Sequence, residues 1–289
     1  MSAILLDGKR AAAAIRAEVA AEVERMRAAG AAAPSLAVVL CGDNPASAVY
    51  VRNKQRAAEQ AGIRFALHTP AATSTTGDLV ALVRSLDADD EVDALLVQLP
   101  LPPQIDADAA VEALSPGKDA DGFHPLNFGR LAEGRATLVQ PGTPLGCMEL
   151  LRRYEVPVAG RRAVVVGRSA IVGRPLALLL TNADATVTIC HSKTADLAAV
   201  CREADILVAA TGRPGWMDAS YVKPGACVID VGTTPWNGTV VGDVDFAAVE
   251  PVAGWLSPVP GGVGPMTVAM LLRNTLSLAQ QRRRNATPV

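Results

Sequence analysis

The sequence predicts an α/β protein of two domains, in which parallel strands alternate with helices. Apolar runs of strand length recur along the chain, and longer alanine-rich stretches of helical character separate them. Two segments rich in Gly, Pro and Asp, at 115–131 and 140–144, interrupt this alternation, which then resumes. We therefore expect the first domain to comprise residues 1–141, joined by 264–289, and the second to comprise 142–263.

The composition argues against several classes of protein. With 289 residues, 50% of them hydrophobic, and a mean hydropathy of +0.24, the chain has enough apolar side chains for packed cores. A net charge of -2 and a pI near 6.0 indicate no basic surface for nucleic acid or for an anionic membrane. No apolar run approaches the ~18 residues of a membrane-spanning helix, and the first residues do not resemble a signal peptide. We therefore expect no nucleic-acid partner and no membrane partner.

The cysteines and histidines predict a reduced protein without a metal. The five cysteines form no C-x-x-C pair, and their odd number argues against a secreted disulfide framework. The three histidines, His68, His124 and His191, stand far apart in the sequence without a Cys or another His at ligand spacing. We expect a cytoplasmic location and no metal site.

The elements of the first domain begin with an alanine-rich stretch at 8–30, which predicts a helix. A later helix opens at the segment DNPAS, where Asn44 is a suitable N-cap and Pro45 suits the first helical position. Apolar runs bounded by turn residues predict strands at 36–42, 64–69 and 92–102.

The second domain shows the pattern of a Rossmann-like dinucleotide-binding unit. Helical stretches are expected after the first two strands and, before the fourth, at 216–225. Beyond the last strand, a rigid loop at 257–267 leads to an amphipathic stretch at 268–282, which predicts a helix that returns to the first domain. The predicted strands lie at 161–167, 185–190, 205–210 and 226–232.

A strand, a turn and a helix follow one another in AVVVGRSAIVGRPLALLL. The free N–H groups at the start of such a helix can bind a phosphate that lies over the turn. The usual G-x-G-x-x-G spacing is absent, because five residues separate Gly167 from Gly173. This segment alone fits both a phosphate-binding turn and an ordinary turn in which the glycines permit close packing.

The end of the next strand favours NADP over NAD as the cofactor. NAD-binding units carry an Asp or Glu about 20 residues after the turn, whereas this strand ends in His191, Ser192 and Lys193. A hydroxyl and positive charges, together with Arg168 in the turn, suit the 2′-phosphate of NADP. Simple solvation at the surface is the alternative for Arg168 or Lys193 taken singly.

Tyr50 and Lys54 are one helical turn apart and share a face near the end of a strand, where ligands bind in α/β sheets. A lysine acts as a base when its amine is neutral, and burial favours the neutral form. Gln98, which closes another strand, can hold the amine without stabilising its charge as a carboxylate would. We therefore predict acid–base chemistry at Lys54 with Gln98. The alternatives are a solvated lysine and a half-buried packing tyrosine.

Two loops predict contacts with a flat, nitrogen-rich ligand. Asp121, in KDADGFHP, can accept hydrogen bonds from an amino-heterocycle such as a pterin ring. In PVPGGVGP, at 258–265, the prolines stiffen the backbone and the glycines remove side chains, so a flat ligand can approach closely. Alternatively, Asp121 only stabilises the turn in which it lies, and the second loop only links two elements.

Taken together, these motifs resemble the bifunctional methylenetetrahydrofolate dehydrogenase / methenyltetrahydrofolate cyclohydrolase family. The resemblance implies oxidation of methylenetetrahydrofolate by NADP, followed by hydrolysis of the methenyl cation to 10-formyltetrahydrofolate. It also suggests a homodimer. The matching segments occur in order over nearly the whole chain: YVRNK, LLVQLPLP, GKDADGFHPLNFGRL, GTPLGCMELL, VVVGRSAIVGRPLALLL, TVTICHSKT, VIDVG, GDVDF and PVPGGVGPMT.

On the folate side, the resemblance implies a role for each matching residue. Lys54 matches the residue that acts in the hydrolytic step, and Gln98 matches its hydrogen-bonding partner. Tyr50 matches the aromatic residue that stacks on the folate, and Asp121 matches the carboxylate that anchors the pterin. The loop on the substrate side is matched by Gly261, Gly262 and Pro265.

The chain also matches the family pattern on the cofactor side, and along its whole length it departs from that pattern at two positions. Gly142 stands where many members have a cysteine, so no thiol acts at this position. Thr233 stands where many members have an isoleucine, at a position that contacts the nicotinamide side. The nucleotide contacts are matched by Gly167, Arg168, Ser169 and Ser192.

Two other functions fit parts of the sequence. A different NADP-dependent dehydrogenase, acting on an amino acid or a shikimate-like acid, needs a basic cluster for the substrate carboxylate. Only Arg52 and Arg56 are candidates, and on a helix they lie away from the line through Tyr50 and Lys54. A non-catalytic nucleotide-binding regulator binds NADP without turnover, and the combination of Tyr50, Lys54 and Gln98 argues against it.

Overall fold

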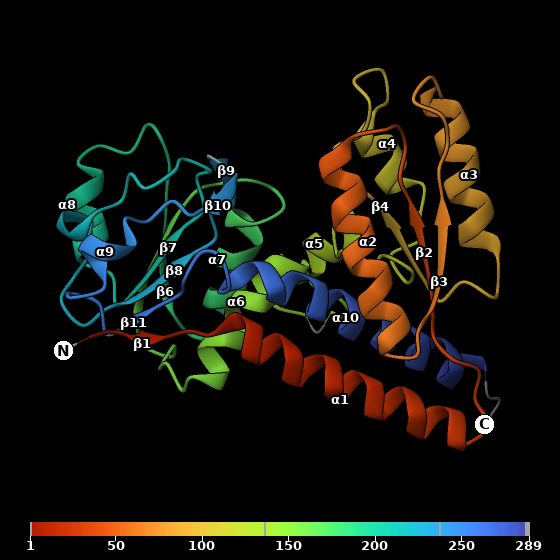
Figure 1. Cartoon of the computed structure of the whole chain (residues 1–289), viewed down its shortest axis with the longest axis horizontal. Coiled ribbons are helices and arrows are strands. Elements are labelled where there is room, and N and C mark those ends of the chain that lie inside the picture. Colours follow the sequence, from red (N-terminus) through yellow and green to blue (C-terminus); the bar gives the residue numbers. More distant parts are fainter. Residues whose placement is uncertain (1, 136, 237, 287–289) are drawn as a thin grey trace. The chain divides into compact units, whose positions relative to one another are not determined.

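The computed structural model describes the chain in three stretches: residues 2–135, 137–236 and 238–286 (Figure 1). These residues form two compact units, each built around a parallel sheet. The six-stranded unit comprises the segment that ends at Ala13 together with Pro141–Thr267. The three-stranded unit comprises Ala14–Gln140 together with the segment that begins at Val268.

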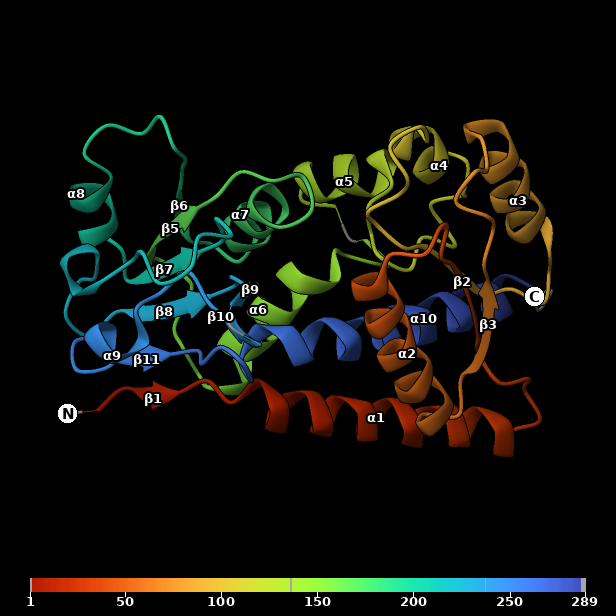
Figure 2. The same ribbon diagram turned by 45° about the horizontal axis from the view of Figure 1, so that its top comes forward.

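The three-stranded unit has a parallel sheet with the strand order β3-β2-β4. All residues of β2 and β4 are buried, so both faces of this part of the sheet are covered, as is usual for parallel sheets. Helices α2 and α3 lie on opposite sides of the sheet (Figure 2). The strands are β2 (Ser35–Val39), β3 (Arg64–His68) and β4 (Ala94–Val97). The helices are α2 (Pro45–Gln60), α3 (Thr76–Ala88), α4 (Ala107–Glu112) and α5 (Pro125–Ala132), with most of α1 (Gly8–Ala28) and of α10 (Val263–Ala286).

Helix α3 illustrates how the sequence directs packing in this unit. It begins at a capping box, in which the Thr75 side chain and the Asp78 side chain each accept a hydrogen bond from the other residue's backbone N–H. Its buried residues, Leu79, Val83 and Leu86, are spaced so that they share one helix face. That face packs on β2 and β4 in the hydrophobic core of the unit.

The six-stranded unit has a fully parallel sheet with the strand order β1-β11-β8-β7-β5-β6. Its strands are β1 (Ile4–Leu5), β5 (Arg162–Val166), β6 (Thr186–Cys190), β7 (Ile206–Ala209), β8 (Cys227–Asp230) and β11 (Trp255–Leu256). Its helices are α6 (Gly142–Arg153), α7 (Gly173–Asn182), α8 (Leu197–Arg202) and α9 (Phe246–Val249), with the 3₁₀ helix η1 (Ala219–Tyr221). A hairpin of β9 (Thr234–Trp236) and β10 (Thr239–Val241) is attached to it.

The structure confirms the predicted fold class, and it differs from the sequence-based expectation in three places. Strand β1 pairs with β11 and so belongs to the six-stranded sheet, although the predicted division assigned it to the first domain. The predicted helix at 216–225 contains only the three residues of η1, because Gly and Pro stand on both sides of it. Helix α10 begins at Val263, inside the predicted loop at 257–267. The boundaries 1–141 and 142–263 themselves stay a prediction.

The C-terminal helix returns to the first domain, as expected. The buried Asn274 side chain donates hydrogen bonds to the carbonyl oxygens of Ala120 and Gln140, each 2.9 Å long. Further along α10, Arg283 forms an ion pair of 3.1 Å with the buried Asp93. Among the described residues, no helix has the length and apolar character required to cross a membrane, and no cluster of metal-ligating side chains is present.

Candidate active site

Helix α2 carries two of the predicted site residues and begins as the sequence indicates. Pro45 is its first residue, and the Asn44 side chain accepts a hydrogen bond of 3.2 Å from the backbone N–H of Ser47. This cap satisfies one of the free N–H groups at the start of the helix. The helix follows β2, so its first turns lie near the carboxyl end of that strand. Tyr50 and Lys54 project from these turns.

Lys54 is buried and paired with Gln98, as predicted. Only 8% of the surface of Lys54 is exposed, and its Nζ donates a hydrogen bond of 3.0 Å to Gln98 Oε1. The Gln98 amide is oriented by a second hydrogen bond, of 2.6 Å, from its Nε2 to the carbonyl oxygen of Leu99. Because the Nε2 donates to a carbonyl, the amide oxygen is the atom that faces the lysine. The pair is therefore held in one orientation before any ligand binds.

Tyr50 lies one helical turn before Lys54 and differs from it in burial. Its surface is 54% exposed, so the ring is not part of the core, although about half of it is covered by the protein. An exposed ring next to a buried amine is available to stack on a flat ligand.

Asp121 lies within electrostatic range of Lys54. It is half-buried, in the loop that pairs with β4 through a bridge between Leu95 and Asp119. Burial raises the pKa of the Asp121 carboxyl above its ordinary value, while the positive charge of Lys54 lowers it and the nearby Asp119 raises it. The fold thus brings a carboxyl group, a lysine and a glutamine from three sequence segments into one neighbourhood of the three-stranded unit.

The sequence reasoning missed Asp119, which shapes this loop. Its buried carboxylate accepts hydrogen bonds from the backbone N–H groups of Gly122, Phe123 and His124, at 2.8 to 3.2 Å, and from the Asn127 side chain at 2.9 Å. These bonds fix the backbone that carries Asp121. The signal was present in KDADG, where an Asp three residues before a Gly is typical of a side chain that folds a turn around itself.

The glycines of the predicted substrate-side loop are required by backbone packing. A Cβ atom on Gly262 would lie 2.6 Å from the carbonyl oxygen of Pro258, and Gly261 has a φ of 115° that favours glycine. Pro265 lies in the first turn of α10, where a missing N–H costs nothing. The fold therefore accounts for these residues, and their contact with a ligand stays a prediction.

The predicted phosphate-binding turn connects β5 to α7. Gly167 has a φ of 135°, and a Cβ atom on it would lie 2.2 Å from the carbonyl oxygen of Ala210. A Cβ atom on Gly173 would lie 2.1 Å from the carbonyl oxygen of Gly167. The hydroxyl oxygen of Ser169 accepts hydrogen bonds from the N–H groups of Val172 and Gly173. Both glycines are thus required for a turn that packs closely against the start of the helix.

The polar residues predicted to bind the 2′-phosphate lie at the ends of adjacent strands. Strands β5 and β6 pair in register, with Val166 opposite Cys190. Arg168 and Ser192 each lie two residues beyond this pair, and both are exposed. They therefore lie at the same edge of the sheet with free access to solvent, which fits the binding of an anionic group. Thr233, beyond the end of β8, is also exposed at the carboxyl end of its strand.

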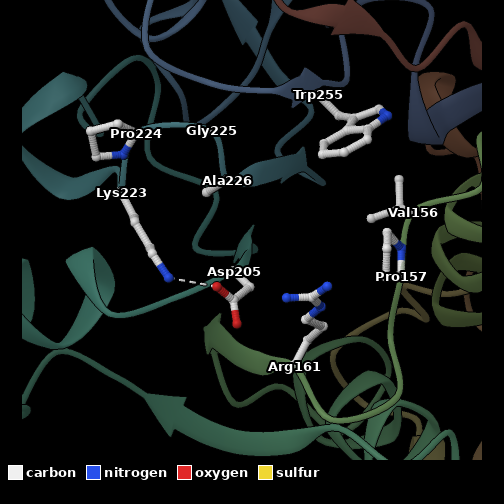
Figure 3. Close-up of a pocket in the computed structure, with 9 residues that line it drawn as sticks. All are labelled: Val156, Pro157, Arg161, Asp205, Lys223, Pro224, Gly225, Ala226 and Trp255. Carbon is white, nitrogen blue, oxygen red and sulfur yellow. Dashed lines mark hydrogen bonds and ion pairs between the residues drawn. The ribbon is translucent and has the colours of Figure 1, made fainter.

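A pocket of about 180 Å³ lies at the opposite, amino edge of the same sheet (Figure 3). Its residues precede or begin β5, β7, β8 and β11. Within it, Lys223 and Asp205 form an ion pair of 2.6 Å. No predicted site residue lines this pocket, so it is separate from the predicted cofactor edge. It is lined by Val156, Pro157, Arg161, Asp205, Lys223, Pro224, Gly225, Ala226 and Trp255.

One unit has a parallel sheet with a glycine-lined strand–turn–helix, and the other has a buried pair formed by Lys54 of α2 and Gln98 just after β4. This combination is typical of an α/β enzyme of the nucleotide-dependent dehydrogenase class. Residues 6–121 match the catalytic domain of tetrahydrofolate dehydrogenase/cyclohydrolase, and residues 141–283 match the NAD(P)-binding domain of the same enzymes. The chain belongs to the tetrahydrofolate dehydrogenase/cyclohydrolase family. This confirms the resemblance that the motifs indicated. It argues against the two other functions considered from the sequence, a non-catalytic nucleotide-binding regulator and a different NADP-dependent dehydrogenase.

Individual relatives are similar over nearly their full length. The bifunctional protein FolD of Koribacter versatilis (strain Ellin345) is 54% identical over an alignment of 308 positions, which includes gaps and covers 99% of each chain. The FolD methylenetetrahydrofolate dehydrogenase/cyclohydrolase of Campylobacter jejuni superposes with a TM-score of 0.95 at 45% identity, covering 97% of this chain and 100% of that one. The enzyme of Trypanosoma brucei, solved with NADP cofactor and inhibitor, has a TM-score of 0.94 and 41% identity, covering 98% and 99% of the two chains.

Proposed function

We propose that this protein oxidises 5,10-methylenetetrahydrofolate with NADP and then hydrolyses the 5,10-methenyl product to 10-formyltetrahydrofolate. The observation that carries the proposal is the buried Lys54–Gln98 pair, with its hydrogen bond of 3.0 Å, in a chain that belongs to the family named for these two activities. A buried amine held by an amide is suited to the proton transfer that the second reaction needs.

The first reaction removes a hydride from the carbon that bridges the two folate nitrogens. NADP, when bound, accepts this hydride. The bridging carbon and the two nitrogens then share one positive charge, which a nearby ammonium group would repel. Gln98 accepts one of the N–H bonds of Lys54 and so holds this nitrogen in place for the next step.

In the second reaction, water adds to the bridging carbon. The water oxygen forms the new C–O bond, and the Lys54 amine takes the proton that the water gives up. The oxygen then gives up its second proton to solvent and forms the carbonyl double bond, while the bond from the carbon to one folate nitrogen breaks. That nitrogen receives the proton held by Lys54, and the formyl group stays on the other nitrogen, so that one proton is released overall. Lys54 serves as base in the addition and as proton donor in the ring opening.

Three further groups are assigned to folate binding. Tyr50, which is exposed, stacks on the flat ring system, and Asp121 accepts hydrogen bonds from the nitrogens of the pterin. The raised pKa of Asp121 fits a carboxyl group that gains a polar partner when the ligand binds. The loop with Gly261, Gly262 and Pro265 is the third group assigned to the substrate.

The strand ends of the six-stranded unit are assigned to NADP. The turn with Gly167 and Ser169 receives the pyrophosphate, Arg168 and Ser192 bind the 2′-phosphate, and Thr233 lies on the nicotinamide side. In support, the glycines keep the turn free of side chains, and the end of β6 offers a hydroxyl and no carboxylate.

The protein is further assigned a homodimeric state in the cytoplasm. The edge strand β6 exposes Ile189, and the hairpin exposes Trp236, and a second copy would cover such apolar side chains. The five cysteines are free and buried, which fits a reducing compartment. Light scattering coupled to size exclusion tests the dimer, for which we expect about twice the mass of one chain.

The test of function uses two separate substrates. With methylenetetrahydrofolate and NADP, we expect formation of NADPH, followed at its absorbance. With methenyltetrahydrofolate alone, we expect loss of the methenyl chromophore. If NADPH forms but the methenyl chromophore is lost no faster than in buffer, the protein is a dehydrogenase without the hydrolytic activity. If neither activity is found, the proposed function is refuted.

A further inference from the structure

A fully buried carboxylate holds the loop that follows β7. Asp243 has no exposed surface, and its carboxylate accepts hydrogen bonds from the backbone N–H groups of Thr211, Gly212 and Arg213. The Thr211 hydroxyl donates a further bond of 2.8 Å to the same carboxylate. Three consecutive residues of the loop are therefore bound to one side chain, and their N–H groups satisfy its charge without a cation.

A second carboxylate holds the first in place. Asp230, at the end of β8, is 3% exposed and accepts hydrogen bonds of 2.9 Å from the backbone N–H groups of Gly232, Asp243 and Val244. It thus fixes both the backbone of Asp243 and the start of the loop after β8. A glycine at position 232 leaves space for the two carboxylates. A Cβ atom on Gly232 would lie 2.4 Å from Asp243 Oδ1.

The loop held by Asp243 lies between the two parts of the predicted cofactor edge. The carbonyl oxygen of Ala210, which precedes the loop, packs against Gly167 in the turn after β5. On the other side, the Thr234 hydroxyl donates a hydrogen bond of 3.2 Å to the carbonyl oxygen of Gly212, and Thr234 is adjacent to Thr233. The strand order β8-β7-β5 also places this loop, which follows β7, between the turn after β5 and the segment after β8. The loop is therefore next to both Gly167 and Thr233, with no other strand end in between.

We propose that Asp243 is a positioning residue for the nicotinamide dinucleotide, because its carboxylate fixes residues 211–213 at the centre of the cofactor edge while Asp230 fixes Asp243. The inference rests on the proposed function, since it takes this edge as the binding site for NADP. Asp243 acts through the loop backbone and touches neither the folate nor the reacting atoms. Its loss therefore affects the step that uses the dinucleotide and spares the hydrolysis, which needs none.

The main variant is Asp243→Asn, which keeps the shape of the side chain and turns an NH₂ group toward the loop N–H groups. We expect the dissociation constant and the KM for NADP to rise about tenfold or more, because hydrogen bonds to a charged group are among the stronger ones. The kcat of the dehydrogenase should change much less. The rate of hydrolysis of methenyltetrahydrofolate should stay within about twofold of the parental rate, which is well below a tenfold change, the equivalent of 1.4 kcal/mol.

Two further variants complete the experiment. Thr211→Val removes the hydroxyl, which donates to Asp243 and accepts a hydrogen bond of 2.9 Å from Trp216 Nε1, and keeps the backbone N–H bonds to Asp243. It should raise the KM for NADP in the same direction by a smaller factor. Asp218→Asn is the matched control, because Asp218 is an exposed carboxylate that caps η1 and is bonded to Ser220. It should leave the affinity for NADP and both activities unchanged.

The outcomes separate the inference from its alternatives. An unchanged affinity for NADP in folded Asp243→Asn overturns it, and so does a parallel loss of hydrolysis and oxidation, which indicates a merely structural role. If Asp243→Asn fails to fold, an unchanged KM for NADP in Thr211→Val overturns it. If the parent has neither folate activity, the proposed function fails, and titration of the parent and the variants with NADP still tests the role of Asp243.

Discussion

The two units bury charged groups at the carboxyl ends of their strands in different ways. In the three-stranded unit, the Lys54 amine is bound to the side-chain amide of Gln98. In the six-stranded unit, the carboxylates of Asp230 and Asp243 are bound to backbone N–H groups of the neighbouring loops. Among the described residues, the Lys54 amine has one hydrogen-bond partner, which leaves its other donor positions open toward a ligand. The two carboxylates are each bound to several backbone N–H groups and so hold loops in place.

A second difference concerns exposure. Lys54 is buried and oriented in advance, whereas Arg168 and Ser192 are exposed at the predicted cofactor edge. Burying a guanidinium with no anion beside it costs free energy, so a cation that awaits a phosphate is best left in water. The comparison shows that the group proposed for proton transfer is fixed by the fold, while the groups proposed to bind a phosphate are left in solvent and would gain their partner from the ligand.

The largest expected effect tests the buried amine. Lys54→Met keeps the length and the apolar stem of the side chain and removes the nitrogen. We expect hydrolysis of methenyltetrahydrofolate to slow by about 10²–10⁴-fold, the usual contribution of a positioned acid–base group. The rate at which the methenyl chromophore is lost measures this hydrolysis. Arg52→Met, which removes an exposed charge from the same helix, should keep the parental rate. Equal rates in Lys54→Met and the parent would remove Lys54 from the mechanism.

The second effect concerns Asp230, whose pKa burial raises to about 6 from an ordinary 3.8. The folded state therefore binds the proton more tightly than the unfolded state, so this group stabilises the fold increasingly as the pH falls from about 6 to about 4. This difference in pKa corresponds to about 3 kcal/mol in the free energy of unfolding. Asp230→Asn removes the titrating group and with it this dependence on pH.

Thermal unfolding of the parent and of Asp230→Asn, measured between pH 4 and pH 7, checks this expectation. The stability lost in the variant should be greatest at the acid end of the range, because only the parent gains from protonation there. A constant difference between the two at every pH would contradict the raised pKa of Asp230.

The third effect tests the exposed cofactor groups. Arg168→Ala should lower the preference for NADP over NAD by about 10- to 100-fold, the amount expected when one charge-assisted contact to a phosphate is lost. The ratio of kcat/KM for the two cofactors measures it. Arg161→Ala, at the amino edge of the same sheet, is the control and should leave the ratio unchanged. If the ratio is also unchanged in Arg168→Ala, the 2′-phosphate is bound elsewhere.

The smallest effect is expected at the amino edge, in the pocket of Figure 3. Lys223→Met breaks the ion pair with Asp205, which lies partly in solvent. Such pairs contribute less than about 1 kcal/mol, so the melting temperature should fall slightly and both activities should stay at the parental level. A large loss of either activity would show that the two edges of the sheet are not independent.

Much of the proposed site was predictable, because its residues lie at the ends of strands or on the helix that follows one. The apolar runs predicted the strands, and parallel strands bring their carboxyl ends to one edge. This reasoning pointed to Lys54 and Gln98, which the structure brings within 3.0 Å of each other. It missed Asp119 and Asp243, because their partners are backbone N–H groups. A backbone donor is present at every non-proline residue and leaves no signal in the sequence.

The sequence by itself determined the fold class, the family and the residue types at the strand ends, because hydrophobic periodicity and turn residues act over short distances along the chain. Only the tertiary structure decided that β1 joins the six-stranded sheet, that Tyr50 is exposed while Lys54 is buried, and that Asp230 fixes Asp243. Each of these depends on contacts between segments far apart in the chain. Strand pairing and burial are properties of the packed molecule, and no local pattern specifies them.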